Sequence, residues 1–356
     1  MNRIRSIRLF IQTFEIKFSN RPLYVPVLMW GMVCTLLCLS NVQAIFKAKN
    51  NGNSGAAFLK IGAGARPSAL GDAFTGVADD INSIYWNTAG LATLKKKEFI
   101  AMRAQLFEDM QYNFFAYAHP TQKLGTFAIG LNNLNVNDLE KRTADTDSAD
   151  STFQSNDSAY TLGYAYTLPL QLIGNINLGA GFKYIRQTLD SYTANSLAID
   201  LGSLYTFENS PLAIGFTAQN IGTKAKFKTE GDSLPLTFKL GTSYRLGQDW
   251  TFSGIPSEND SVHNGLLLAA DFSLPKDNDP EIKMGMELTR SWTENLSGSL
   301  RGAGYQVGNN GQISSLGGLG FSAGLGLTYK RFTFDFAWKP FKDLGNTYRY
   351  SILLRF

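Results

Sequence analysis

Residues suited to acid–base or nucleophilic chemistry are scarce in this chain. Its 356 residues include two histidines, His119 and His263, and both fall at predicted strand ends beside turns. No spacing joins either of them to a serine and a carboxylate as a hydrolytic triad requires. Both cysteines, Cys34 and Cys38, lie in an N-terminal segment that we expect to be removed, which leaves no cysteine nucleophile and no thiolate metal site. We therefore do not expect an enzyme, and we assign no catalytic residue.

Acidic and glycine-rich motifs do not predict a cofactor site either. Asp145, Asp147 and Asp150 resemble calcium ligands in composition, but the loop glycine and closing glutamate are missing, so we interpret them as a solvated acidic loop. The run Gly62-Ala63-Gly64-Ala65-Arg66-Pro67 has proline where a dinucleotide fingerprint has its third glycine, and no strand–helix–strand unit follows. We predict neither a metal nor a cofactor, and we expect these glycines to allow close backbone packing.

A larger set of charged residues has the spacing of one strand face. These residues are Lys183, Asp200, Lys239, Asp271, Lys283, Glu287, Arg301, Asp335, Arg349 and Arg355. Together with Arg66, Asp72, Asp79 and Asp80 of an earlier segment, these residues carry nearly equal numbers of positive and negative charges. We therefore interpret them as a hydrogen-bonded network. The alternative interpretation is a polar path for a substrate.

Strands are the elements that would position these charges. After Leu94 we count fourteen strand-like runs, at 96–106, 110–119, 123–135, 158–169, 174–188, 195–208, 211–220, 234–246, 263–274, 281–290, 295–306, 319–330, 332–340 and 346–356. Apolar residues alternate with polar ones, as in Phe332, Phe334 and Phe336 against Thr333 and Asp335. A soluble sandwich also alternates, but a polar face that mixes charge with glycine is typical of a barrel lumen. We predict an all-β membrane protein in which residues 95–356 form a fourteen-stranded antiparallel transmembrane barrel.

The stretch before the strands, residues 45–94, has a different pattern. It is crowded with small residues and contains two short helical patterns, near 66–70 and 79–85, each too short to be stable alone in water. A fourteen-stranded barrel lies between about eight strands, which side chains fill, and about 16 to 18, which leave a channel. We therefore predict that residues 45–94 form a lumenal plug, or hatch, with short helices.

The candidate site residues follow from this arrangement. Plug and lumen candidates are Arg66, Asp72, Asp79, Asp80, Trp86, Asn87, Arg349 and Arg355. The aromatic residues Phe58, Phe74 and Tyr85, with Trp86, form either the core of the plug or the wall of an apolar pocket. The sequence does not separate these two arrangements.

Residues 1–44 have the pattern of an export signal. Five basic residues precede or begin an apolar run from Leu23 to Leu39, and Val42-Gln43-Ala44 predicts cleavage after Ala44. A membrane anchor is the competing interpretation. Removal of this segment takes five of the 33 Lys and Arg and one of the 29 Asp and Glu, so the mature chain is neutral. Its charge gives no support for nucleic-acid binding.

The connections between runs predict an orientation. The long polar connections 136–157, 221–233 and 307–318 fall on one side and are expected to be external, whereas most connections on the periplasmic side are short. Residues 247–262 are too long for a periplasmic turn and do not fit this rule.

Two stretches resemble a known family. The run from Phe58 to Ala92, FLKIGAGARPSALGDAFTGVADDINSIYWNTAGLA, is similar to the N-terminal signature of the PorV/PorQ family, which is related to FadL-type outer-membrane transporters. The end, PFKDLGNTYRYSILLRF from Pro340 to Phe356, resembles the last hairpin of that family, and a terminal phenylalanine after alternating apolar residues resembles the signal read by the barrel-assembly machinery. One departure is Asn87-Thr88-Ala89-Gly90, because the family usually has proline where Thr88 stands, which predicts a softer hinge.

The resemblance implies an exported bacterial outer-membrane protein with an N-terminal hatch. PorV-type relatives serve type IX secretion and bind exported cargo, so the external loops 136–157 and 307–318 become the expected cargo surface. FadL-type relatives admit hydrophobic small molecules, which is the alternative function. Expected partners are outer-membrane lipids, the barrel-assembly machinery and either secreted cargo or a hydrophobic solute, with no nucleic acid.

Overall fold

The computed structural model describes residues 54–107, 109–145, 147–170, 174–207, 210–246, 264–306, 319–341 and 345–356. The predicted signal peptide of residues 1–44, His263 and the connections 247–262 and 307–318 lie outside the described residues. No helix within the described ranges is long and apolar enough to cross a membrane.

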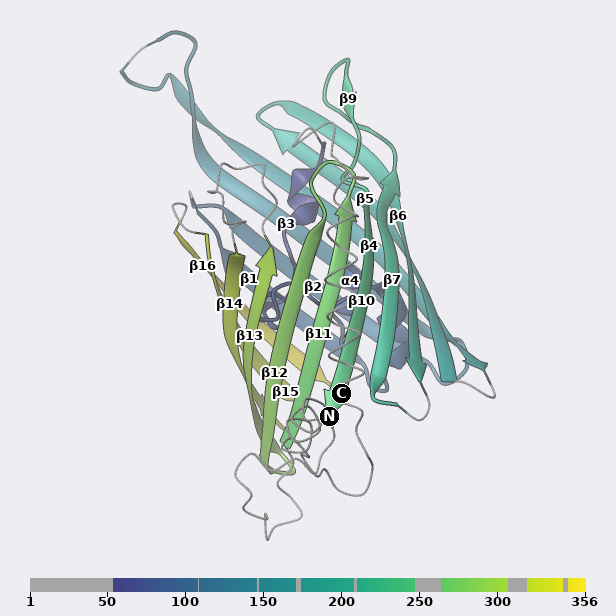
Figure 1. The fold of residues 1–356 in the computed structure, drawn as a ribbon. Coiled ribbons are helices and arrows are strands. Elements are labelled where there is room, and N and C mark those ends of the chain that lie inside the picture. Colours follow the sequence, from purple (N-terminus) through teal and green to yellow (C-terminus); the bar gives the residue numbers. More distant parts are fainter. Residues whose placement is uncertain are drawn as a thin grey trace, which may run out of the picture. The chain divides into compact units, whose positions relative to one another are not determined.

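Fourteen antiparallel strands close into a barrel (Figure 1). They are β1 (Glu98–Gln105), β2 (Gln111–Pro120), β3 (Thr126–Lys141), β4 (Ser151–Leu170), β5 (Gly174–Leu189), β6 (Tyr192–Phe207), β7 (Leu212–Gly222), β10 (Thr237–Leu246), β11 (Asn264–Pro275), β12 (Glu281–Thr293), β13 (Leu296–Gln306), β14 (Leu319–Tyr329), β15 (Phe332–Pro340) and β16 (Asn346–Arg355). Each strand pairs with its neighbour in sequence, except that β7 pairs with β10 across the short β8 (Ala225–Lys226) and β9 (Gly231–Asp232), and β1 closes the barrel against β16. The predicted fourteen-stranded antiparallel barrel is confirmed.

The alternation of side chains decides which face is the lumen. On β15, Phe334 is 46% exposed whereas Thr333 is 7% exposed, and the same period of two runs through β16. Successive strand residues point to opposite faces, so on most strands large apolar side chains cover the outside and polar side chains line the inside. This is the pattern of an outer-membrane barrel surrounded by lipid. On β1 and β2 the inward side chains include the apolar Ile100, Met102 and Phe114, which pack with the N-terminal segment.

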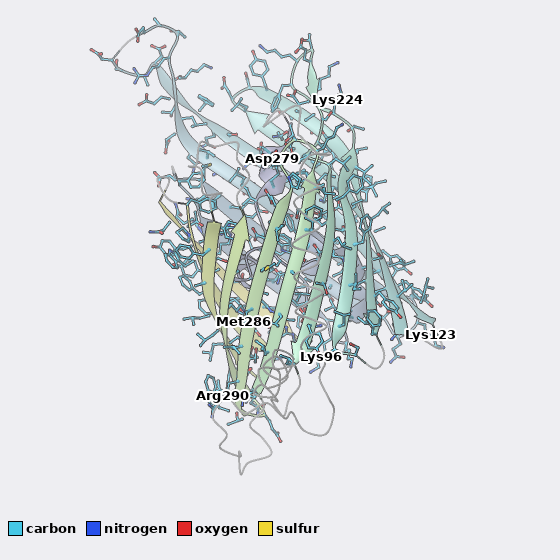
Figure 2. All side chains as sticks on the ribbon, in the orientation of Figure 1. Lys96, Lys123, Lys224, Asp279, Met286 and Arg290 are labelled. Atoms are coloured by element: carbon cyan, nitrogen blue, oxygen red, sulfur yellow. The ribbon has the colours of Figure 1, made fainter. Side chains whose placement is uncertain are left out.

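The two ends of the barrel differ in their connections. One end, here called the C-terminal end, holds Phe356, whose backbone pairs with Lys97, and the tight β14–β15 turn. The other end, here called the loop end, holds the β3–β4, β7–β10 and β11–β12 connections. In Figure 2, Lys224 and Asp279 lie at the loop end, whereas Lys96, Lys123 and Arg290 lie toward the C-terminal end.

The β3–β4 connection is more regular than predicted. The sequence predicts a polar loop over 136–157, but β3 continues to Lys141 and β4 starts at Ser151, so most of this stretch is a hairpin. Backbone pairing does not depend on apolar side chains, and a shift in register between Val136 and Leu139 accommodates the polar residues. The hairpin projects beyond the neighbouring strand ends in Figure 1.

Residues 54–94, here called the N-terminal segment, contain short helical turns. These are the 3-10 helices η1 (Ala57–Lys60) and η2 (Thr88–Thr93) and the α-helices α3 (Ala65–Ala69) and α4 (Ser83–Trp86). The helix predicted over 79–85 is wrong at its start, because α4 begins at Ser83 and has no acid in its first turn. Asp80 instead accepts hydrogen bonds from the backbone and side-chain amides of Asn82, both at 2.8 Å.

Candidate functional site in the barrel lumen

The N-terminal segment packs against inward-facing residues of the barrel wall at very short range. A Cβ added to Gly76 would lie 2.6 Å from the Cα of Thr242 on β10, and one added to Gly285 on β12 would lie 2.5 Å from the Leu70 carbonyl oxygen. These positions need glycine because backbone meets backbone there. The glycines of the polar strand face thus allow the segment to lie directly on the wall.

Arg66 is the centre of one charge network between segment and wall. Its guanidinium lies 2.5 Å from Asp79 and 2.8 Å from Asp80 within the segment, and 2.8 Å from Glu287 on β12. Arg301 on β13 contacts the same Glu287 at 2.5 Å. Buried charges need this kind of complete pairing to offset the loss of water.

The same network extends to two further strands. Asp79 also lies 2.8 Å from Arg245 on β10, and Arg301 lies 2.7 Å from Asp335 on β15. Burial raises the pKa of the Asp79 carboxyl, but Arg66 and Arg245 outweigh burial and hold that pKa well below its usual range. Asp79 is therefore a carboxylate that ties the segment to the wall.

Asp72 is the centre of a second network on the loop-end side of Arg66. It accepts from Lys339 on β15 at 2.6 Å. Burial raises the pKa of Asp72, but Lys339, Lys283 and Arg349 together lower it below its ordinary value. Arg349 is buried, and its Nε has no hydrogen-bond partner among the described residues.

The aromatic candidates Phe58, Phe74, Tyr85 and Trp86 all lie in buried apolar clusters. Phe74 is fully buried in the main apolar cluster, and Phe58 belongs to a second cluster. The Tyr85 hydroxyl lies 2.9 Å from the Leu59 carbonyl, and Trp86 Nε1 donates to Ala63 at 2.8 Å. Among the described residues, then, these side chains pack as core of the segment, and none of the four lines an apolar lumen pocket.

A small cavity does lie beside Tyr85 and Trp86, and it is polar. Its volume is about 90 Å³, and its charged lining residues come from the segment, β10 and β12: Lys60, Asp72, Lys239, Glu281 and Lys283. The Lys239 ammonium lies 4.7 Å from the centroid of the Trp86 ring. A cavity of this size holds a few waters or one small polar ligand.

Asn87 fixes the segment nearer the C-terminal end, whereas Arg355 makes its contacts within the barrel wall. Asn87 donates to Thr75 at 2.9 Å and to Ser203 on β6 at 3.0 Å, and its side chain accepts from Ala89 at the start of η2. Arg355 lies 2.8 Å from Glu98, the first residue of β1. The predicted site residues are thus spread along the segment and over β16, in two networks and several single contacts.

An outward-facing groove offers the apolar surface that the lumen cavity lacks. Its volume is about 840 Å³, and its walls are apolar side chains of β12 to β15: Leu288, Trp292, Leu300, Leu325, Leu327, Phe334 and Phe336. These residues lie on the face that meets lipid, and several are among the exposed large apolar residues.

The histidine and the acidic residues to which the sequence assigns no chemical role lie at a strand end and at the tip of a hairpin. His119 lies near the end of β2, and its Nδ1 is 3.1 Å from the Tyr117 hydroxyl. Asp150 accepts from the Thr143 backbone and hydroxyl at the tip of the β3–β4 hairpin. No group of three potential ligands that could hold a metal ion occurs within the described ranges.

Comparison with known families decides what kind of barrel this is. A model of the type IX secretion system protein PorV matches residues 46–255, which is more than half of the 356-residue chain. The chain belongs to the PorV family. Among curated proteins, no sequence matches it.

Solved outer-membrane barrels resemble this PorV family member at low identity. The CymD monoaromatic hydrocarbon channel is 9% identical with a TM-score of 0.50, and the match covers 83% of this chain and 98% of CymD. The Ralstonia pickettii toluene transporter TbuX is 11% identical with a TM-score of 0.46, over 83% and 98% of the two chains. A Pseudomonas aeruginosa FadL homologue is 10% identical with a TM-score of 0.43, over 87% and 99%. At this identity the likeness to CymD shows the fold alone.

Several contacts of this PorV family member were not predicted from sequence. Lys60 lies 2.6 Å from Asp277 in the β11–β12 connection, and Ser54 donates to the same carboxylate. Gln219 on β7 donates to the Tyr85 carbonyl at 2.5 Å, and Glu98 accepts from the Ile81 backbone at 2.9 Å. The lumen-facing position of Gln219 is readable from its strand, but its partner lies 134 residues away, and no sequence signal identifies such a partner.

Proposed function

We propose that this barrel acts in type IX secretion as a closed scaffold that displays its loop end to exported proteins. Family membership supports the secretion role. The observation that carries the closed state is the contact of the N-terminal segment with the wall, through glycine backbones and through the Arg66 and Asp72 networks. In this proposal the segment acts as a plug. The other partners of the barrel are outer-membrane lipid and the barrel-assembly machinery.

The β3–β4 hairpin is the part of the cargo surface that the described residues include. Residues 136–157 contain six acidic and two basic residues. Both basic residues already contact acids, since Arg142 lies 2.6 Å from Glu140 and Lys141 lies 2.6 Å from Asp190. The excess negative charge favours cargo with a basic contact surface, because complementary charge steers association.

Shortening this hairpin tests the proposal. In a host with a type IX system, residues 142–150 are replaced by a two-residue Asn-Gly turn, which suits a hairpin. We expect surface attachment of secreted proteins to fall while the barrel still assembles and shows normal heat-modifiable migration. A matched control variant replaces Lys123 and Leu124 of the β2–β3 turn, at the C-terminal end, by Asn-Gly. Unchanged secretion with the shortened hairpin, or equal loss in the control, contradicts a role for this surface.

A channel for hydrophobic small molecules is the alternative function, and the fold relatives named as hydrocarbon channels and transporters are in its favour. It needs an apolar path past the segment, and the lumen cavity described above is small and polar. Uptake of toluene into vesicles containing the purified barrel distinguishes the two. We expect no uptake above that of empty vesicles, and saturable uptake would favour the channel instead.

A further inference from the structure

The polar cavity at the loop end has one lysine that differs from its neighbours. Three of the four lysines near it lie within ion-pair distance of a carboxylate: Lys60 at 2.6 Å from Asp277, Lys283 at 2.9 Å from Glu281 and Lys339 at 2.6 Å from Asp72. Lys239 on β10 is 9% exposed and has no carboxylate within 4.0 Å among the described residues. Among these four lysines, Lys239 is therefore the one without a paired carboxylate.

The acid next to Lys239 in the sheet, on the neighbouring strand β11, binds the N-terminal segment and does not pair with Lys239. Asp271 on β11 accepts from the backbone amides of Phe74 at 3.1 Å and Thr75 at 2.8 Å. Those contacts direct the carboxylate toward the N-terminal segment. An ammonium without a paired charge in a buried site costs free energy, because the lost hydration is not replaced.

A second donor without a partner stands directly opposite Lys239. Ser273 is the cross-strand partner of Lys239 in the β10–β11 register, and it is 2% exposed. Its hydroxyl lines the same cavity and has no hydrogen-bond partner among the described residues. Buried polar groups in native proteins nearly always have a partner, so an ammonium and a hydroxyl that share a cavity point to a missing acceptor.

We propose that this cavity binds a small free oxyanion of the carboxylate or monobasic phosphate type. Lys239 supplies the charge, Ser273 supplies a hydrogen bond, and Trp86 forms the wall on the side of the N-terminal segment. Asp72 and Glu281 also line the cavity, each beside its own lysine, and they limit the ligand to a single negative charge. The ligand bridges segment and wall, so it stabilises the closed lumen. The site does not depend on the secretion role proposed above.

Thermal unfolding of the purified barrel in detergent tests this site. Acetate replaces chloride at constant ionic strength and pH 7, because a ligand of the folded state alone raises the unfolding temperature in a saturable way. We expect this rise in the unmodified protein and its loss in Lys239→Met. Ser273→Ala should weaken acetate binding about tenfold, as expected for one hydrogen bond to a charged group. Tryptophan emission should change over the same acetate range.

Two comparisons separate a binding site from a purely structural lysine. Lys224→Met removes an exposed lysine at the same end and should leave the acetate response unchanged. Without acetate, Lys239→Met should be at least as stable as the unmodified protein, because an unpaired charge has been removed. A response to acetate in Lys239→Met, or no response in the unmodified protein, overturns the proposal. If Lys239→Met does not fold, an unchanged acetate affinity in Ser273→Ala overturns it equally.

Discussion

Lys339 on β15 and Asp72 in the N-terminal segment form an ion pair of 2.6 Å between residues that are 267 positions apart. Both side chains are nearly buried. The pair is a direct link between the barrel wall and the segment, and its strength determines how firmly the segment is held.

Breaking this pair from one side should destabilise the protein. Asp72→Asn leaves Lys339 buried without its countercharge, which costs about 3–5 kcal/mol for a buried pair. Guanidinium unfolding of the barrel in lipid vesicles measures the loss. The double variant Asp72→Asn/Lys339→Met should recover part of it, and Lys141→Met, which breaks an exposed pair with Asp190, should change nothing measurable. Equal effects of Asp72→Asn and Lys141→Met would argue against a buried link.

Adding a side chain at Gly285 should displace the segment without preventing barrel closure. A Cβ there meets the Leu70 carbonyl oxygen, whereas a Cβ at Gly265, on the neighbouring strand, has nothing within 4 Å. We expect Gly285→Val to expose residues 54–94 to limited proteolysis, and we expect Gly265→Val to leave them protected. Heat-modifiable migration on gels checks that both barrels assemble. Protection of the segment in Gly285→Val would contradict the close packing described here.

Acid should loosen the segment in a defined pH range. The folded-state pKa values of Asp72 and Asp79 are lowered below their usual values by the cations around them, which outweigh burial. Stability from such groups is fully present above the unfolded pKa of about 3.9 and is lost as pH falls through the lower folded values. Tryptophan emission should therefore stay constant from pH 7 to about 5 and shift only below that. In Asp79→Asn the change in tryptophan emission at acid pH should be smaller. A change in emission centred near neutral pH would contradict the assignment of the acid response to Asp72 and Asp79.

Charge on the outer face should block membrane assembly, whereas the same charge on the inner face should not. Phe334→Asp places a carboxylate against lipid, at a cost on the order of 2–4 kcal/mol or somewhat less for an acid. Thr333→Asp places it in the lumen, within reach of Arg355, which donates to the Thr333 hydroxyl at 3.2 Å. Heat-modifiable migration after refolding into vesicles distinguishes the two. Normal assembly of Phe334→Asp would contradict the assignment of faces.

Restoring proline at position 88 should stiffen the segment. Thr88 is the first residue of η2, and Asn87 before it is extended, with φ −155° and ψ 98°, a backbone that proline requires of its predecessor. Thr88→Pro should stabilise the protein by about 0.4–1 kcal/mol through a less flexible unfolded chain. The equivalent change at Thr75, whose backbone amide donates to Asp271, should destabilise it. Guanidinium unfolding measures both, and a destabilised Thr88→Pro would show that proline does not fit η2.

The sequence by itself determined the barrel. Twelve of the fourteen strands were predicted within three residues of their observed bounds, and only β3 and β4 run further, into the hairpin that was predicted as a loop. The agreement arises because alternation with a period of two is a local property, and because lipid outside and charge inside give each face a distinct composition. Charged residues such as Glu287 and Asp335 were likewise assigned correctly to the inner face, since strand position fixes side-chain direction. The start of α4 was missed because Asp79 and Asp80, which resemble a helix N-terminus, pair with Arg66.

Only the tertiary structure decided which charges meet. Arg66 with Glu287, Lys60 with Asp277 and Asp72 with Lys339 are each joined across more than 200 residues, and no local pattern encodes such a choice. Only the tertiary structure shows that Lys239 lacks a paired carboxylate, whereas each of the other lysines around the cavity has one. Which residues pair depends on how the closed barrel and the folded N-terminal segment come together in space. Burial makes each pairing important for stability, because water is no longer available to replace a missing partner.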